Sequence, residues 1–171
     1  MTPKARKKPV RSLLVDTSAL LPSVKNGLGA MKSEHVAAHI LDELRPGFAD
    51  SLDLDAALQP GREQQNRWDY LLGHTSSGEV IALEPHSAKD DEVRTIIAKR
   101  KAAREQLTGH LAASARIAKW FWVASGKVRF ADTEKARRQL DQHGIEFIGT
   151  RLLAKHLADL APSTKKKWRR G

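Results

Sequence analysis

The stretch Arg67–Glu92, RWDYLLGHTSSGEVIALEPHSAKDDE, contains two apolar runs joined by a polar loop. The runs RWDYLLGH and EVIALEPH have the length of strands, and the loop TSSG supplies the glycine that a hairpin turn favours. The sequence therefore predicts an antiparallel hairpin. Two acids within it, Asp69 and Glu84, need a separate explanation, because an unpaired acid is costly to bury.

Further elements are predicted on both sides of the hairpin. Residues 33–44, SEHVAAHILDEL, space their apolar side chains as an amphipathic helix with Ser33 as its N-cap. Residues 48–58, FADSLDLDAAL, begin with the alternation of a short strand. Ser87 is expected to cap a helix after the hairpin. The buried stripe of that helix is predicted to contain Val93, Ile96, Ile97, Ala103 and Leu107.

The last third of the chain continues the alternation of strands and helices. Residues 116–125, RIAKWFWVAS, are apolar on both faces, as in a central strand covered by helices on both sides. A helix over 133–144, a strand over 145–149 and a closing helix over 150–160 follow. The expected fold is a mixed α/β sheet flanked by helices, in a single domain over residues 13–161. Residues 1–12 are expected to form a flexible basic arm and residues 162–171 a basic tail.

The composition excludes some kinds of site and favours others. The chain has 171 residues and no cysteine, which excludes disulfides and thiolate zinc sites and is compatible with the cytoplasm, where we expect the protein. No stretch has the pattern of a signal peptide or a membrane span, so no membrane partner is expected. The net charge is +10, and ten of the 30 Lys and Arg residues lie in residues 1–11 and 165–170. The remaining 20 balance the 20 acids.

Basic termini of this kind favour nucleic acid, because lysine and arginine contact phosphates without sequence preference. An aromatic side chain in the C-terminal cluster KKKWRR is suited to stacking on a base. A solubilising terminus is the alternative. The residues predicted to contact nucleic acid, with DNA favoured, are Lys7, Lys8, Arg11, Lys165, Lys166, Lys167, Trp168, Arg169 and Arg170.

The two acids of the hairpin are predicted to lie close together. Side chains alternate along a strand, so Glu84 and His86 share one face. Asp69 can lie beside Glu84 if the register allows, since cross-strand neighbours are about 5 Å apart. Two carboxylates that close repel each other, and a bound Mg²⁺ or Mn²⁺ ion removes the repulsion. A plain structural alternative is that both acids pair with Arg67, Arg94 or Lys119.

The arrangement of Asp69 on one strand, Glu84-Pro85-His86 on the next and a helix directly after resembles the restriction-endonuclease-like nucleases, the PD-(D/E)-x-K superfamily. The resemblance covers about residues 33–148. It implies a restriction-endonuclease-like core, a metal-dependent nuclease activity, and Asp69 and Glu84 as metal ligands with Glu43 as a further carboxylate. His86 stands where that family has its lysine, so His86 or Lys89 is expected to assist catalysis.

Other functions stay open. Residues 13–24, LLVDTSALLPSV, resemble the first strand of PIN-domain ribonucleases, which implies a Mg²⁺ site with Asp16, Glu43 and Asp132. A catalytically inactive nucleic-acid-binding module on the restriction-endonuclease-like fold is a second alternative. A third is an interaction module, with a homodimer or another protein as its partner.

Overall fold

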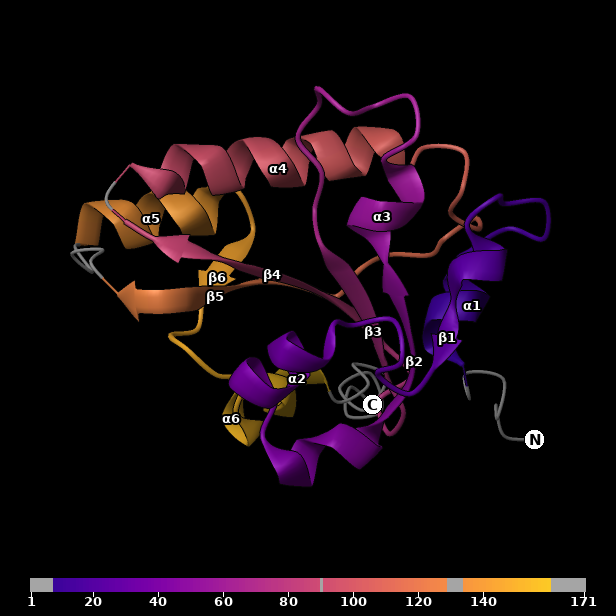
Figure 1. The fold of residues 1–171 in the computed structure, drawn as a ribbon, viewed down its shortest axis with the longest axis horizontal. Coiled ribbons are helices and arrows are strands. Elements are labelled where there is room, and N and C mark those ends of the chain that lie inside the picture. The colour runs from indigo at the N-terminus through magenta and orange to yellow at the C-terminus, as the bar shows by residue number, and fades with distance from the viewer. Residues whose placement is uncertain (1–7, 90, 129–133, 161–171) are drawn as a thin grey trace, which may run out of the picture.

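The computed structural model describes residues 8–89, 91–128 and 134–160 of the chain (Figure 1). The expected α/β class is confirmed: six strands form one open mixed sheet, in the order β1-β2-β3-β4-β5-β6. Strands β1 to β4 pair antiparallel, and β4, β5 and β6 pair parallel. The strands are β1 Lys25–Asn26, β2 Phe48–Asp53, β3 Tyr70–His74, β4 Val80–Ala88, β5 Lys119–Val128 and β6 Ile145–Phe147.

Helices cover both faces of this sheet. Helices α4 and α5 lie on one side, and α2 and α6 lie on the other (Figure 1). The α-helices are α1 Pro9–Leu13, α2 Ser33–His39, α3 Leu54–Leu58, α4 Glu92–Gln106, α5 Glu134–Gln142 and α6 Ala154–Leu157. Three 3₁₀ turns are η2 Leu21–Ser23, η3 Asp42–Gly47 and η4 Ala158–Leu160. Within the described part of the chain, no helix is long and apolar enough to cross a membrane.

The predicted hairpin is confirmed as β3 and β4. Tyr70 pairs with Leu83 and Gly73 pairs with Val80, in antiparallel register. Helix α4 then carries the chain back across the sheet, so that β5 runs parallel to β4.

The sheet separates two apolar cores by strict alternation of side chains. Ala82, Trp120 and Trp122 lie in the core shared with α1, α3, α4 and α5. Leu83 and Phe121 lie in the core shared with segments around α2 and α6. Strand β5 therefore buries apolar side chains on both faces, as its sequence predicts.

The helix predicted over residues 33–44 is shorter in the structure. It begins at Ser33 and ends at His39. The N-cap is Lys32, and not Ser33 as the sequence predicts. Long-range contacts end it there, because Ile40 forms a parallel bridge with Leu152. The Arg45 side chain also donates to the Ile40 carbonyl at 3.0 Å, so the chain leaves the helical path.

The sequence predicts Ser87 as the cap of α4, and this prediction is wrong. Strand β4 continues to Ala88, so Ser87 lies within the strand. Asp91 occupies the N-cap position instead. The Ser87 hydroxyl donates to Oε2 of Glu92 at 3.3 Å, so this serine still ties the strand to the first turn of the helix.

The folded domain begins before residue 13, which corrects the expectation of a flexible arm for residues 9–12. Val10 in α1 is fully buried. The carboxylate of Asp50, 1% exposed, accepts from the backbone N–H groups of Val10 and Arg11, both at 3.0 Å. The close approach needs Gly73, because a Cβ atom there would lie 2.2 Å from Oδ1 of Asp50 and 3.0 Å from Pro9.

Candidate active site

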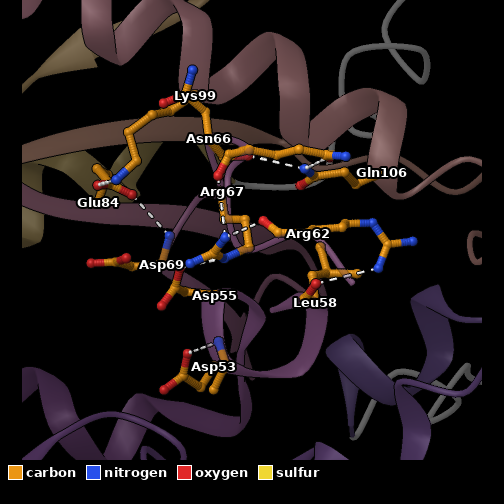
Figure 2. Close-up of polar contacts among 12 residues, drawn as sticks. Asp53, Asp55, Leu58, Arg62, Asn66, Arg67, Asp69, Glu84, Lys99 and Gln106 are labelled. Atoms are coloured by element: carbon orange, nitrogen blue, oxygen red, sulfur yellow. Dashed lines mark hydrogen bonds and ion pairs between the residues drawn. The ribbon is translucent and has the colours of Figure 1, made fainter. Parts of the chain in front are cut away.

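The hairpin brings Asp69 and Glu84 together. Asp69 directly precedes β3, and its backbone N–H donates to Oε1 of Glu84 at 2.8 Å (Figure 2). The carbonyl of Asp69 accepts from the N–H of Leu54 at 2.7 Å and from that of Asp55 at 3.3 Å, at the start of α3. Asp69 is therefore held by backbone bonds on both sides. The closeness predicted from strand alternation is confirmed.

A lysine from α4 completes the group. Glu84 is fully buried, and its Oε2 contacts Nζ of Lys99, whose side chain is 15% exposed. Figure 2 shows the Lys99 side chain reaching from α4 down to the carboxylate. Burial strengthens the attraction of the two charges, because less water screens them than at the surface. We call Asp69, Glu84 and Lys99 the acid-lysine group.

His86 borders the acid-lysine group on the same face of β4, as the alternation predicts. Its Nδ1 lies 3.6 Å from Oε2 of Glu84, and its Nε2 lies 2.7 Å from Oε1 of Glu92. Its side chain is 25% exposed. Glu92 therefore orients the imidazole.

Burial controls the protonation of both acids. Burial, and after it the nearby Asp69 carboxylate, raise the pKa of Glu84 to about 8, against the opposing effect of Lys99. Burial also raises the pKa of Asp69 to about 6, again opposed by Lys99. The site thus holds protons more tightly than two ordinary carboxyl groups, and an additional cation would favour their release.

The alternative in which both acids pair with surface cations is wrong, because among the described residues neither acid pairs with any of the three predicted partners, Arg67, Arg94 and Lys119. Arg67 donates to Asp55 at 2.9 Å (Figure 2). Lys119 lies 3.5 Å from Asp159 and 3.9 Å from Glu146. The carboxylate of Asp69 makes no hydrogen bond or ion pair with any residue that the structure describes, so its oxygens are free for a ligand.

Glu43, predicted as a further metal ligand, is exposed in η3. The carboxylates that most affect Asp69 are Asp55 and Asp53, which come from α3 and the end of β2. Lys89 is exposed after β4. Its role in catalysis stays a prediction, and the lysine that contacts Glu84 is Lys99.

The stretch that resembles a PIN-domain strand does not form one. Its first residue, Leu13, ends α1, and Leu14 makes only an isolated bridge with Leu111. Asp16 lies exposed in a turn. Asp132 lies outside the described residues.

Most of the residues predicted to bind nucleic acid also lie outside the described residues: Lys7, Lys165, Lys166, Lys167, Trp168, Arg169 and Arg170. Two remain within them. Lys8 donates to Oδ1 of Asn26 at 2.5 Å. Arg11 is exposed on α1.

The acid-lysine group offers two carboxylates, those of Asp69 and Glu84, to a divalent ion. Over residues 8–89, 91–128 and 134–160, no group of three or more His, Asp or Glu side chains is arranged to hold a metal. Asp69 and Glu84 alone fit Mg²⁺ or Mn²⁺ better than zinc, because Mg²⁺ is commonly held by one or two carboxylates and keeps several waters. The free carboxylate of Asp69 is the observation that favours this fit.

The sequence interpretation missed Lys99, although a signal for it was present. Lys99 lies three residues after Ile96 and four before Ala103, and both of these are fully buried. Positions three and four apart share a face of a helix, so Lys99 lies within the buried stripe of α4. A lysine in such a stripe needs a buried acid as its partner.

No protein-family model, curated protein or solved structure matches this chain.

Proposed function

We propose that the protein is a metal-dependent nuclease that hydrolyses phosphodiester bonds in nucleic acid, with DNA as the favoured substrate. The observation that carries the proposal is the fully buried carboxylate of Glu84, which lies between Asp69 and Lys99 on one face of the sheet. A buried acid pair with a lysine is costly for stability alone and is typical of sites that bind or transform a ligand.

In this proposal Asp69 and Glu84 hold a Mg²⁺ or Mn²⁺ ion, which would polarise the phosphate and increase the acidity of a bound water. Lys99 stabilises the negative charge that develops on the phosphate oxygens. His86, oriented by Glu92 at 2.7 Å, accepts a proton from the attacking water or passes one to solvent. Lys99 thus takes the part that the resemblance assigns to a lysine on β4.

The element order supports a restriction-endonuclease-like core as part of this proposal. Helix α2 precedes the antiparallel strands β2, β3 and β4, with the five-residue helix α3 between β2 and β3, and α4 then leads to the parallel strand β5. This order agrees with the helix, three strands, helix and strand that the resemblance implies. Asp69 lies directly before β3 and Glu84 lies on β4, close to the positions from which the resemblance takes its metal ligands.

Cleavage assays test the proposal. Purified protein is incubated with plasmid DNA and with RNA in Mg²⁺ and in Mn²⁺, and we expect cleavage of DNA by the wild type. Lys99→Met keeps most of the side-chain length without the charge, and we expect a rate loss of about 100-fold or more. Arg94→Ala, an exposed site on the same helix, is the control and should retain activity. Intact nucleic acid after incubation with the wild type would count heavily against a nuclease.

One observation favours a second function, a nucleic-acid-binding module without catalysis. Both oxygens of Glu84 already have partners within the chain, namely the N–H of Asp69 and Nζ of Lys99. A carboxylate satisfied in this way can be purely structural. A binding module would hold DNA equally well in chelator and in Mg²⁺, and would cleave in neither.

A further inference from the structure

Two adjoining cavities border α4 and the segment 107–117. The first has a volume of about 310 Å³ and is lined by Arg100, Arg104, Arg116, Thr108 and Trp120, among others, with no acidic residue in its wall. The second, of about 470 Å³, shares Arg100, Arg104 and Thr108 with the first. It adds one further lysine, one histidine and one glutamate. We call the first cavity the arginine pocket.

Arg100 is a fixed cation in the wall of this pocket. Its guanidinium carbon lies 5.0 Å from the centre of the Trp120 ring, a stacking geometry that holds the charged group in place. On another side it approaches Gly144, where an added Cβ atom would lie 3.0 Å from its Nη2. Its Nε is buried and has no hydrogen-bond partner. The stacking on Trp120 therefore fixes the position of the guanidinium group in the wall of the pocket.

The positive charge of the pocket is not neutralised by the described part of the chain. None of Arg100, Arg104 and Arg116 forms an ion pair with a described residue. Burial lowers the pKa of Arg100, and the neighbouring Arg104 lowers it further, as expected where like charges meet without an acid between them. Like charges repel in this arrangement, and an anion between them relieves the repulsion.

We propose that the arginine pocket binds a phosphate group of nucleic acid. Guanidinium groups bind phosphate through paired N–H donors, and the three arginines of the pocket offer more donors than a carboxylate could use. The phosphate is either a terminal phosphomonoester or an internal phosphodiester of the strand. Neither Asp69, Glu84 nor Lys99 lines the pocket, so it is a site separate from the acid-lysine group.

Nucleic acid is taken as the source of the phosphate because of the proposed function, and the inference rests on it to this extent. Binding of phosphate in the pocket does not require cleavage. Binding is therefore measured in EDTA, by fluorescence anisotropy of a labelled single-stranded DNA oligonucleotide. The oligonucleotide is used with a 5′-phosphate and with a 5′-hydroxyl. A protein that does not cleave nucleic acid can still bind DNA through the pocket, and an active nuclease can lack such binding. The failure of one proposal is therefore distinguishable from the failure of the other.

The variant Arg104→Ala/Arg116→Ala removes two exposed side chains of the pocket, so the fold should be retained, and thermal unfolding checks this. The matched control Arg94→Ala/Arg151→Ala removes the same charge from exposed positions outside the pocket. We expect the pocket variant to bind DNA at least about 10-fold more weakly than the control. The affinity of the pocket variant should also depend less on salt concentration. We expect the slope of the logarithm of the association constant against the logarithm of the salt concentration to be smaller in magnitude by about two.

Two outcomes support the pocket and identify its ligand. A preference for the 5′-phosphorylated oligonucleotide that disappears in the pocket variant assigns the site to a terminal phosphate. Equal weakening for both oligonucleotides assigns it to an internal phosphodiester. Equal affinity of the pocket variant and the control, or no binding by the wild type, overturns the proposal.

Discussion

Glu84→Gln removes a carboxylate charge from the centre of the sheet while keeping the shape of the side chain. The pKa of Glu84 is about 8 in the folded protein, against an ordinary value of 4.5. Because this pKa is raised, the folded protein binds the proton more tightly than the unfolded chain. The stabilisation is present below pH 4.5 and is lost as the pH rises through about 8.

The size of the effect follows from the same two values. A difference of about 3.5 pKa units corresponds to an upper bound of about 5 kcal/mol in the free energy of unfolding. The opposing effect of Lys99 is already contained in the folded-state pKa, so it does not lower this bound again. Between pH 5 and pH 8.5 the wild type should therefore lose stability relative to Glu84→Gln.

Urea denaturation in EDTA, at several values of pH, measures this difference directly. Asp69 is present in both proteins, so most of its own titration cancels in the comparison. Glu34→Gln, at an exposed position, is the control and should follow the wild type at every pH. Parallel stability curves for the wild type and Glu84→Gln would refute the reasoning, because they would mean that Glu84 titrates at the same pH in both states.

Three further predictions follow from other contacts. Lys99→Met leaves the Glu84 carboxyl without its cation, so the pH at the midpoint of the stability loss should rise. Lys99→Arg should bring this midpoint back part of the way to the wild-type value. Denaturation curves at several values of pH measure both variants. Asp50→Ala removes the acceptor of two backbone N–H groups in α1, and we expect a loss of about 2 to 4 kcal/mol in urea denaturation, with wild-type stability as the contrary result. Gly73→Ala would place a Cβ atom 2.2 Å from Asp50, so the protein should unfold at a lower temperature by calorimetry, and an unchanged midpoint would contradict the packing of α1.

The sequence predicts the hairpin well because its signals are local. Strand alternation and a loop of suitable length place Asp69 beside Glu84 without knowledge of the rest of the fold. The same alternation places His86 on the face of Glu84. These steps need only the period of two residues that any strand has.

The position of Lys99 could not be predicted with the same certainty because it depends on tertiary packing. How α4 is rotated over the sheet is set by the burial of Val93 and Ile96 against it. The early end of α2 has a similar origin, since the bridge from Ile40 to Leu152 joins segments more than a hundred residues apart. Local periodicity carries no information about such partners.

The metal site at Asp69 and Glu84 is tested by calorimetry of Mn²⁺ binding to the wild type and to Asp69→Asn at pH 8.5. Plasmid cleavage is assayed on the same samples. Asp69→Asn keeps the backbone N–H that Glu84 accepts and removes only the carboxylate charge. We expect the wild type to bind Mn²⁺ and cleave DNA, and the variant to lose both together. A wild type that binds no metal, or a variant that cleaves at the wild-type rate, would contradict the proposed metal site.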